Sequence, residues 1–259
     1  MSTLNGKIAI ITGASRGIGR AIALRLAKEG ARTALCARDA DALTSAVREI
    51  ESAGGIAASI ALDLRLPDSP ACLADFAMDT FEGIDIVVNN AGATKRGEFA
   101  GLTDDDWADG FALKFFGAVR LTRAAWPHLQ TRSGSVVNIS GIGGRTPGSQ
   151  FTIGGSVNAA LLSFTKAMAE TGVRDGVQVN AINPGTIRTD RYQTRIAAIA
   201  AEQQIDPAEA ERRFVQQERI VRIGEPEDIA SLVAFVTSPE GRYLQGALID
   251  MDGGATKTI

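Results

Sequence analysis

Histidine is nearly absent from this sequence, because His128 is the only one in the chain. We therefore expect neither a catalytic triad built on histidine nor a histidine-rich metal site. The two cysteines, Cys36 and Cys72, lack the spacing of metal ligands. Cys36 falls in a predicted buried strand, where a free cysteine behaves as a small apolar residue. The sequence thus predicts no bound metal.

Long apolar runs and an excess of positive charge are also missing. No run reaches the roughly 18 residues that a membrane-spanning helix needs, and no signal peptide is evident. The formal net charge is −3, from 27 Lys and Arg against 30 Asp and Glu, so nothing suggests a nucleic-acid-binding surface. We expect a cytoplasmic protein without a membrane or nucleic-acid partner, formed by a single domain over residues 1–259.

Residues 7–30 contain an apolar run, a group of glycines and a helical pattern, in that order. The apolar run covers residues 8–11 and predicts a buried strand. Gly13, Gly17 and Gly19 follow, and such glycines allow a tight turn and close approach of the backbone to a pyrophosphate. The start of the helix offers free N–H groups and the positive end of its dipole. Taken alone, the pattern also fits an ordinary glycine-rich turn, because short motifs give false positives.

Strand and helix patterns alternate through the rest of the chain, which predicts an α/β fold with a doubly wound parallel sheet and helices on both faces. Residues 186–219 are polar and helix-like, and we interpret them as a helical insertion over the carboxyl edge of the sheet, where ligands bind in this architecture. Thr103 is expected to cap the helix that follows it. Further strands are expected at residues 32–37, 56–60, 84–88, 135–139, 177–182 and 247–249, and helices at 40–53, 67–81, 104–128, 152–170 and 226–236.

Six short motifs give the chain a resemblance to a known family. They are Thr12-Gly-Ala-Ser-Arg-Gly-Ile-Gly19, Asp63-Leu64, Asn89-Asn-Ala-Gly92, Asn138-Ile-Ser140, Asn183-Pro-Gly185 with Thr189, and Asp252-Gly-Gly254. With these motifs in order, the chain resembles the short-chain dehydrogenase/reductase family over essentially its whole length, and in particular its 3-oxoacyl-carrier-protein-reductase-like members. The resemblance implies a single-domain Rossmann fold with seven strands, a nicotinamide cofactor, oxidoreductase activity on a carbonyl or alcohol, and a homotetramer or homodimer.

The same resemblance implies a set of cofactor-binding residues. Asp63 would accept a hydrogen bond from the adenine amine, and Asn158 would bind a ribose hydroxyl. Each assignment has an ordinary alternative, such as a solvated loop carboxylate for Asp63 or a simple Pro-Gly turn at residues 184–185. The full set is Gly13, Ser15, Arg16, Gly17, Ile18, Gly19, Arg38, Asp63, Leu64, Asn90, Ala91, Gly92, Asn158, Pro184, Gly185, Ile187 and Thr189.

The choice between NAD(H) and NADP(H) depends on the end of the strand at residues 32–37. An acidic residue about 20 positions after the glycine turn binds the ribose 2′-hydroxyl of NAD, whereas an arginine suits the 2′-phosphate of NADP. Arg38 lies at this place and Arg16 lies in the turn, so the sequence favours NADP(H), with NAD(H) as the alternative. The neighbouring Asp39 weakens this preference, and the arginines could also be solvated surface residues.

The resemblance fails at the catalytic positions. The family uses a serine, a tyrosine thirteen residues later, a lysine four beyond that, and an asparagine on the preceding long helix. Here the matching positions hold, in the same order, Gly141, Gly154, Asn158 and Lys114. The catalytic residues are therefore unknown, with Lys114, Ser140 and Tyr192 as candidates and water as a further proton source. For Lys114, the ordinary alternatives are a solvated helix lysine or a salt bridge.

Basic residues gather around the expected substrate cleft, and two functions remain open. The cluster would suit an anionic small-molecule substrate, such as a carboxylate or an acyl thioester of a phosphorylated carrier, or would equally be a solvated helix face with acidic partners. The protein is either an NADP(H)-dependent oxidoreductase with an atypical active site, or a catalytically inactive relative that binds a nucleotide or ligand or serves as a structural subunit. The basic residues are Lys95, Arg96, Arg145, Arg188, Arg191 and Arg195.

Overall fold

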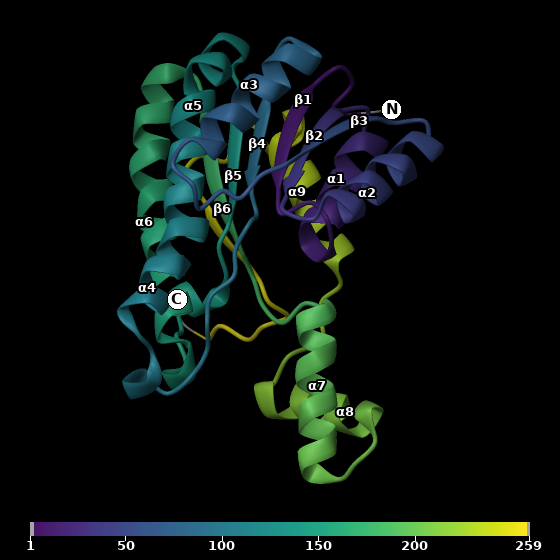
Figure 1. Ribbon diagram of the computed structural model, residues 1–259, viewed down its shortest axis with the longest axis vertical. Coiled ribbons are helices and arrows are strands. Elements are labelled where there is room, and N and C mark those ends of the chain that lie inside the picture. Colours follow the sequence, from purple (N-terminus) through teal and green to yellow (C-terminus); the bar gives the residue numbers. More distant parts are fainter. Residues whose placement is uncertain (1–2, 258–259) are drawn as a thin grey trace.

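Seven parallel strands form one sheet at the centre of the computed structural model, which describes residues 3–257 (Figure 1). Their order is β3-β2-β1-β4-β5-β6-β7. Successive strands are therefore added on one side of β1 up to β3 and on its other side from β4 onward, so the switch point lies between β1 and β4. This confirms the predicted doubly wound Rossmann-type fold, in which ligands bind at the switch point. The strands are β1 (Ile8–Thr12), β2 (Arg32–Ala37), β3 (Ile56–Ala61), β4 (Ile86–Asn89), β5 (Ser135–Ile139), β6 (Gln178–Pro184) and β7 (Leu248–Met251).

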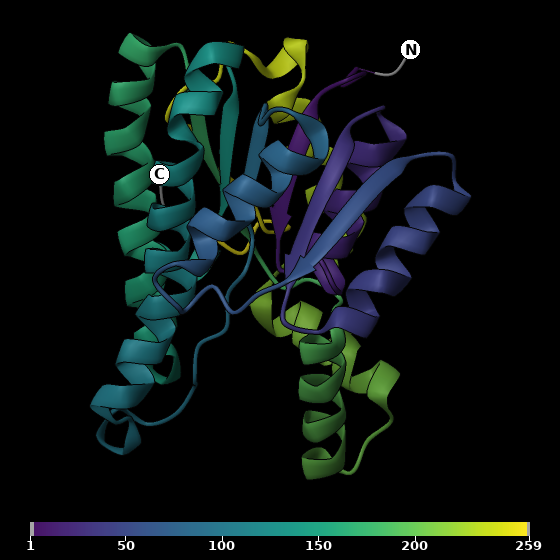
Figure 2. The ribbon, with the colours of Figure 1, turned by 45° about the horizontal axis from the view of Figure 1, so that its top comes forward.

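Helices cover both faces of the sheet (Figures 1 and 2). One face carries α1 (Gly17–Lys28), α2 (Ala40–Ser52) and α9 (Pro226–Thr237), and the other carries α3 (Ser69–Phe81), α5 (Gly117–Arg132) and α6 (Thr152–Asp175). Successive residues of β1 point to opposite faces: Ile10 packs in one apolar cluster and Ile11 in the other. Such strands must be apolar on both sides, which is why the strand segments read as continuous apolar runs.

Two helices project from the carboxyl end of the sheet, directly after β6 (Figure 1). They are α7 (Asp190–Gln203) and α8 (Pro207–Glu218), and they occupy most of the segment 186–219. Their facing sides form a small apolar cluster that includes Ile196 and Phe214. The pair therefore has a core of its own and stands beside the edge where the strands end.

The long helix expected at residues 104–128 differs from the prediction. It begins with α4 (Asp104–Phe111), passes through a π-helical segment (Ala112–Phe116) and continues as α5. Thr103 caps α4 as predicted, because its hydroxyl accepts from the Asp106 amide while the Asp106 carboxylate accepts from the Thr103 amide. The π turn contains Lys114, and such turns occur often at functional sites. Smaller differences are the later start of β4 and the extension of α6 to Asp175.

Neither a membrane-crossing helix nor a metal cluster was found within residues 3–257. No helix in this part of the chain combines the length and apolar character that a bilayer demands. The described residues also contain no group of three or more His, Cys, Asp or Glu side chains that could hold a metal ion. Both cysteines are free thiols; Cys36 is buried in β2 as predicted, and Cys72 is exposed.

A buried polar network connects the middle of the sheet to the helices beside the cleft. The Asn89 amide at the end of β4 donates to Asn138 Oδ1 of β5 at 2.8 Å and to the Thr122 hydroxyl of α5 at 3.2 Å. Asn138 in turn donates to the Thr165 hydroxyl of α6 at 2.9 Å. Buried polar groups cost free energy unless they are paired, so this network fixes how α5 and α6 sit on the sheet.

Replacing the central member of this network should destabilise the fold. We expect Asn138→Ala to lower the free energy of unfolding by about 1–3 kcal/mol, because the Asn89 amide loses a buried acceptor. Urea unfolding followed by circular dichroism measures this. The control is Ser163→Ala on the exposed side of α6, which should change stability by less than about 0.5 kcal/mol. Equal effects of the two substitutions would contradict the role of the network.

Candidate cofactor and substrate cleft

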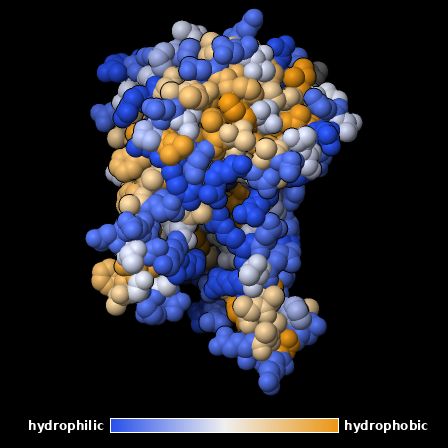
Figure 3. Space-filling model, viewed as in Figure 1, coloured by the Kyte–Doolittle hydropathy of each residue, from blue (hydrophilic) through white to orange (hydrophobic). Residues whose placement is uncertain are grey.

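A cleft of about 800 Å³ follows the carboxyl edge of the sheet and reaches the α7–α8 pair. Its walls come from the glycine turn after β1, from the segments after β2, β4, β5 and β6, and from α7 and α8. Figure 3 shows a hollow between the projecting α7–α8 pair and the body of the molecule, bordered mainly by hydrophilic residues. Its place at the switch point of the sheet is where this architecture binds ligands.

The glycine turn after β1 leaves no room for side chains. Gly13 and Gly17 have φ values of +66° and +54°, which L-residues rarely adopt. A Cβ atom at Gly19 would lie 2.2 Å from the Gly13 carbonyl oxygen. The Asn90 side chain closes the turn from the β4 side by donating to the Thr12 carbonyl at 2.9 Å. The backbone is thus open to a ligand, and no side chain of residues 3–257 caps the first amides of α1.

Arg38 is exposed at the end of β2 and lines the cleft. It forms no ion pair within residues 3–257. The adjacent Asp39 carboxylate caps α2 by accepting from the Ala42 amide at 3.0 Å. Arg16 is also exposed, at 3.8 Å from Asp190. The Asp39 carboxylate is thus directed to the start of α2 and forms no ion pair with Arg38.

Asp63 lies after β3 with its carboxylate held by Arg65. The Arg65 amide donates to it at 3.1 Å and the guanidinium at 3.2 Å. Burial acts to raise the pKa of Asp63, but these hydrogen bonds and the charges of Arg65 and Arg38 lower it below its ordinary value. Asp63 is therefore an ionised acceptor that is already partly occupied, and it stands just outside the cleft lining, next to the buried Leu64, which belongs to it.

The cleft brings together most of the predicted cofactor residues. Ile187 is one that it does not include, since this residue is buried and bridges to Gly224. Asp63 is the other. The predicted residues that line the cleft are Gly13, Ser15, Arg16, Gly17, Ile18, Gly19, Arg38, Leu64, Asn90, Ala91, Gly92, Asn158, Pro184, Gly185 and Thr189.

Lys114 reaches the cleft from the π turn, between the segments that follow β4 and β5. Its Nζ donates to the Ser140 carbonyl oxygen at 2.6 Å, and its stem packs against Gly92. No carboxylate within residues 3–257 forms an ion pair with it. Loss of solvation lowers the pKa of Lys114 from 10.5 to about 7, and the charge of Arg191 contributes to this shift. The amine is thus able to exchange a proton at neutral pH.

Asn158 lies on α6 with its side chain directed into the cleft lining. The residue is only 3% exposed, and its Oδ1 atom has no hydrogen-bond partner within the described chain. Its neighbour Gly141 is close enough that a Cβ there would meet Asn158 Nδ2 at 3.0 Å. The Ser140 hydroxyl donates to the Asn158 carbonyl oxygen at 3.1 Å and so faces the helix backbone. A buried acceptor without a partner is a sign that a ligand donor belongs there.

The space beside Gly154 is filled by a phenylalanine that the sequence analysis did not single out. A Cβ atom at Gly154 would lie 2.0 Å from Phe151 Cζ, and one at Gly143 would lie 2.8 Å from the same ring. The Arg96 guanidinium stands 4.0 Å above the ring centroid. Phe151 and Arg96 both line the cleft. The only sequence signal for this arrangement was the pair of glycines that leave room for the ring.

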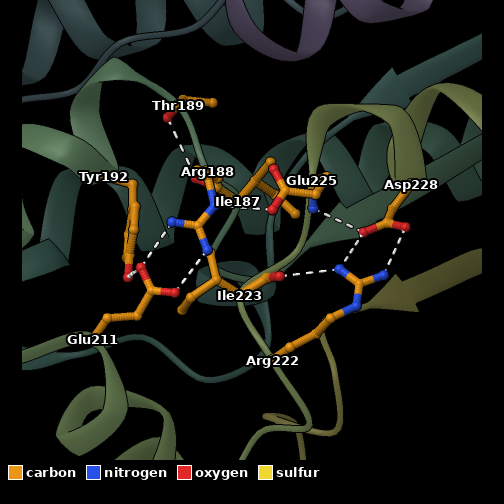
Figure 4. Close-up of polar contacts among 9 residues, drawn as sticks. All are labelled: Ile187, Arg188, Thr189, Tyr192, Glu211, Arg222, Ile223, Glu225 and Asp228. Carbon is orange, nitrogen blue, oxygen red and sulfur yellow. Dashed lines mark hydrogen bonds and ion pairs between the residues drawn. The ribbon is translucent and has the colours of Figure 1, made fainter. Parts of the chain in front are cut away.

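Tyr192 lies in the α7–α8 core instead of the cleft (Figure 4). Its hydroxyl donates to Glu211 Oε2 at 2.9 Å, and its ring packs edge-on against Phe214. Burial and the hydrogen bond to Glu211 raise the pKa of Tyr192 above its ordinary value. Arg188 joins the same group by binding Glu211 and Glu225 (Figure 4). Of the three candidate catalytic residues, only Lys114 and Ser140 therefore line the cleft.

The six basic residues predicted near the cleft separate into two groups of three. Arg96, Arg191 and Arg195 line the cleft and form no ion pair within residues 3–257. The other three form ion pairs with carboxylates of the protein. These are Lys95 with Asp106 at 2.8 Å, Arg145 with Asp250 at 2.8 Å, and Arg188 with Glu211 at 2.7 Å.

Comparison with known proteins places the fold and these motifs in a family. A family model described as enoyl-(acyl carrier protein) reductase matches residues 13–256. An uncharacterised oxidoreductase of Mycobacterium tuberculosis is 37% identical over 259 residues, which cover 99% of this chain and 94% of that protein. The 3-oxoacyl-[acyl-carrier-protein] reductase of Vibrio cholerae is 32% identical over 252 residues, covering 97% and 98%. L-sorbose reductase from Gluconobacter frateurii, in complex with NADPH and L-sorbose, superposes with a TM-score of 0.96 at 32% identity and covers 100% of both chains. The chain belongs to the short-chain dehydrogenase/reductase family.

Proposed function

We propose that this protein is an NADP(H)-dependent oxidoreductase in which Lys114, in place of the usual Ser-Tyr-Lys set, gives or takes the proton at a carbonyl or alcohol. The observation that carries the proposal is the position of Lys114: a cation without a carboxylate partner among the described residues, held in the cofactor cleft by the Ser140 carbonyl. The α7–α8 insertion borders the substrate part of the same cleft.

Several features of the cleft support NADP(H) as the cofactor, with NAD(H) bound more weakly. The glycine turn leaves backbone amides free for a pyrophosphate. Arg38 lines the cleft at the end of β2, where an arginine suits a 2′-phosphate, and it forms no ion pair within residues 3–257. The unpaired Oδ1 of Asn158 is an acceptor for a ribose hydroxyl. L-sorbose reductase, which has the same fold, binds NADPH in its crystal structure. When bound, the nicotinamide supplies or accepts a hydride.

Reduction of a carbonyl needs one proton at oxygen in addition to the hydride at carbon, and the chain must deliver it. The Lys114 ammonium would donate that proton and become an amine, which solvent then protonates again. In the reverse direction the amine would take the proton of the alcohol. A pKa of about 7 suits such a group, since general acid–base catalysis works best near the operating pH. The Ser140 carbonyl keeps Nζ in place.

The alternative is a catalytically inactive relative that binds a nucleotide or ligand, or acts as a structural subunit. Two observations favour it: Phe151 fills the space at Gly154, and the hydroxyls of Ser140 and Tyr192 both donate hydrogen bonds to acceptors within the protein. Neither tyrosine of the described chain lines the cleft. Tight binding of NADPH without reduction of any carbonyl compound would support this alternative.

We further propose a homotetramer, or at least a homodimer, built on α4, α5 and α6. Phe116 at the end of the π turn is 44% exposed, and Val173 on α6 is 73% exposed. Phe115 and Phe164 pack edge to face between the π turn and α6, while Leu161 is buried in the core of the protomer. Contiguous exposed apolar patches mark protein contacts, and we propose that Phe116 and Val173 belong to such a patch. A cytoplasmic location is part of the same proposal, in keeping with two free thiols.

The cofactor assignment predicts a selective effect of Arg38. Arg38→Gln should weaken NADPH binding about 10-fold while leaving NADH binding nearly unchanged, because only NADPH carries the 2′-phosphate. Calorimetric titration of both cofactors measures the two affinities. Arg48→Gln, on the exposed side of α2, is the matched control and should change neither. If the affinity for NADH falls as much as that for NADPH, Arg38 does not bind the 2′-phosphate.

The mechanism predicts that Lys114 controls turnover and its pH dependence. Lys114→Met should lower kcat about 10²–10⁴-fold, the usual contribution of a general acid or base, while NADPH affinity stays within a few-fold. In the unchanged protein, carbonyl reduction should slow as the pH rises through about 7, because the ammonium acid is lost, and alcohol oxidation should accelerate over the same range. Lys166→Met, an exposed position on α6, is the control.

The pH dependence of stability checks the lowered pKa of Lys114 independently of turnover. The folded-state pKa of Lys114 is below its ordinary value of 10.5, so the unfolded chain binds more protons between about pH 7 and 10.5. Lys114 should therefore make the free energy of unfolding rise with pH in this window, and Lys114→Met should remove that contribution. Full turnover in Lys114→Met would exclude the lysine as the proton donor.

Assembly should depend on the exposed phenylalanine of the π turn. We expect light scattering at micromolar concentration to give a dimer or tetramer, and Phe116→Glu to shift it towards smaller species, because a buried charge without a partner is costly. Phe99→Glu is the control, since Phe99 is 68% exposed but lies on the short helix Phe99–Gly101 before α4. A monomer in the unchanged protein would contradict this assembly.

A further inference from the structure

Three arginines without carboxylate partners lie at one part of the cleft. Arg96 comes from the loop after β4, and Arg191 and Arg195 come from α7. The two on α7 are four residues apart, which places them on the same face of that helix. All three line the cleft, and none forms an ion pair within residues 3–257. Three adjacent cations attract an anion.

Each guanidinium is held in place by a group that leaves its charge unneutralised. Arg96 lies over the Phe151 ring at 4.0 Å from the centroid, and Arg195 lies over the Phe214 ring at 4.8 Å. Arg191 donates to the Gly92 carbonyl oxygen at 2.7 Å. These contacts orient the planar groups and still leave N–H donors free, because a guanidinium has five. The three guanidinium groups are therefore oriented by these contacts, and their charges stay available to a ligand.

The three charges also oppose one another. Loss of solvation lowers the pKa of Arg96, and the charges of Arg195 and Arg191 lower it further. Loss of solvation likewise lowers the pKa of Arg191, with a contribution from Arg16. Acidic groups are near but are not paired with the three: Asp190 lies 3.8 Å from Arg16, and Glu218 lines the cleft. Arg188, in the segment between β6 and α7, is instead neutralised by Glu211 of α8 and by Glu225 before α9.

We infer that Arg96, Arg191 and Arg195 bind an oxoanion, a carboxylate or phosphate group, on the substrate. Both groups accept paired N–H donors from guanidinium in a planar fork, which an ammonium cannot offer. The inference rests on the proposed function and adds to it the class of substrate: a carbonyl or alcohol compound that carries an oxoanion.

The three arginines lie next to Lys114, so an oxoanion bound there would position the rest of the substrate. Arg191 binds the Gly92 carbonyl, and the Lys114 stem packs against the same glycine. The charge of Arg191 is felt at the lysine amine. An oxoanion held by the arginines would thus fix a small substrate with its carbonyl near the lysine, and such positioning is a large part of catalysis. Arg96 and Arg195 are positioned to select substrates, whereas Arg191 also borders the cofactor part of the cleft.

Binding of simple anions tests the site without requiring turnover. With the protein saturated in NADPH, calorimetry would measure malonate and inorganic phosphate, with neutral dimethyl malonate as the uncharged probe. We expect at least one anion to bind, and Arg96→Gln and Arg195→Gln each to weaken it about 10-fold or more, as for lost hydrogen bonds to a charged group. Arg96→Lys keeps the charge but not the planar fork of donors, so its affinity for the anion should lie between those of the unchanged protein and Arg96→Gln. Lys95→Gln, which removes the neighbouring charge that Asp106 already neutralises, should have no effect.

The outcomes separate this inference from the proposed function. Binding of malonate alone indicates a carboxylate substrate and binding of phosphate alone a phosphate ester; either supports the site. Failure of both anions to bind, or binding that is unchanged in Arg96→Gln and Arg195→Gln, overturns it. Anion binding without reduction of any oxo acid or keto phosphate would leave the site standing and remove the oxidoreductase proposal. Reduction of neutral ketones with no preference for their anionic counterparts would overturn the oxoanion site and leave the oxidoreductase proposal standing.

Discussion

Parallel pairing of β4 with β1 on one side and β5 on the other is the constraint on which the cleft depends. The register places Ile11 opposite Val88 and Val88 opposite Val137, so the chain segments that follow the three strands leave the sheet at one edge. The glycine turn, the Asn90 segment and Ser140 meet there as a result. The buried network around Asn89 and Asn138 then holds α5, through Thr122, and α6, through Thr165, against the sheet.

Within this frame the cleft contains cationic side chains that form no ion pair with a carboxylate of residues 3–257. Lys114 and the three arginines are held by carbonyl oxygens or aromatic rings, contacts that orient a cation without neutralising it. The three arginines are exposed to the cleft, whereas Lys114 loses solvation there; Arg188, by contrast, is paired with two carboxylates. Their joint presence in a cofactor cleft fits a protein that relies on an anionic ligand to complete its charge balance, and on one lysine with a lowered pKa for proton transfer.

Much of this could be predicted from the sequence where the signal is local. Apolar runs predict the strands, the glycine spacing predicts the turn after β1, and Thr103 as an N-cap predicts the start of α4. The π turn at Lys114 could not be predicted, because one extra residue in a helix hardly alters its apolar periodicity. Tyr192 was a reasonable candidate until its partner Glu211, on another helix, was known. Similarly, the six basic residues look alike in sequence, and only the tertiary structure shows which have acidic partners.

Proton transfer in the cleft requires that the Lys114 amine titrates near neutral pH. Lysine labelled with ¹³C at Cε allows Lys114 to be titrated by NMR in the unliganded protein, with Lys114→Met identifying its signal. The account predicts a midpoint near pH 7, since the Lys114 pKa is lowered to about 7 by loss of solvation. A midpoint close to the ordinary value of 10.5 would mean that the amine is solvated or paired, and would contradict a role in proton transfer at neutral pH.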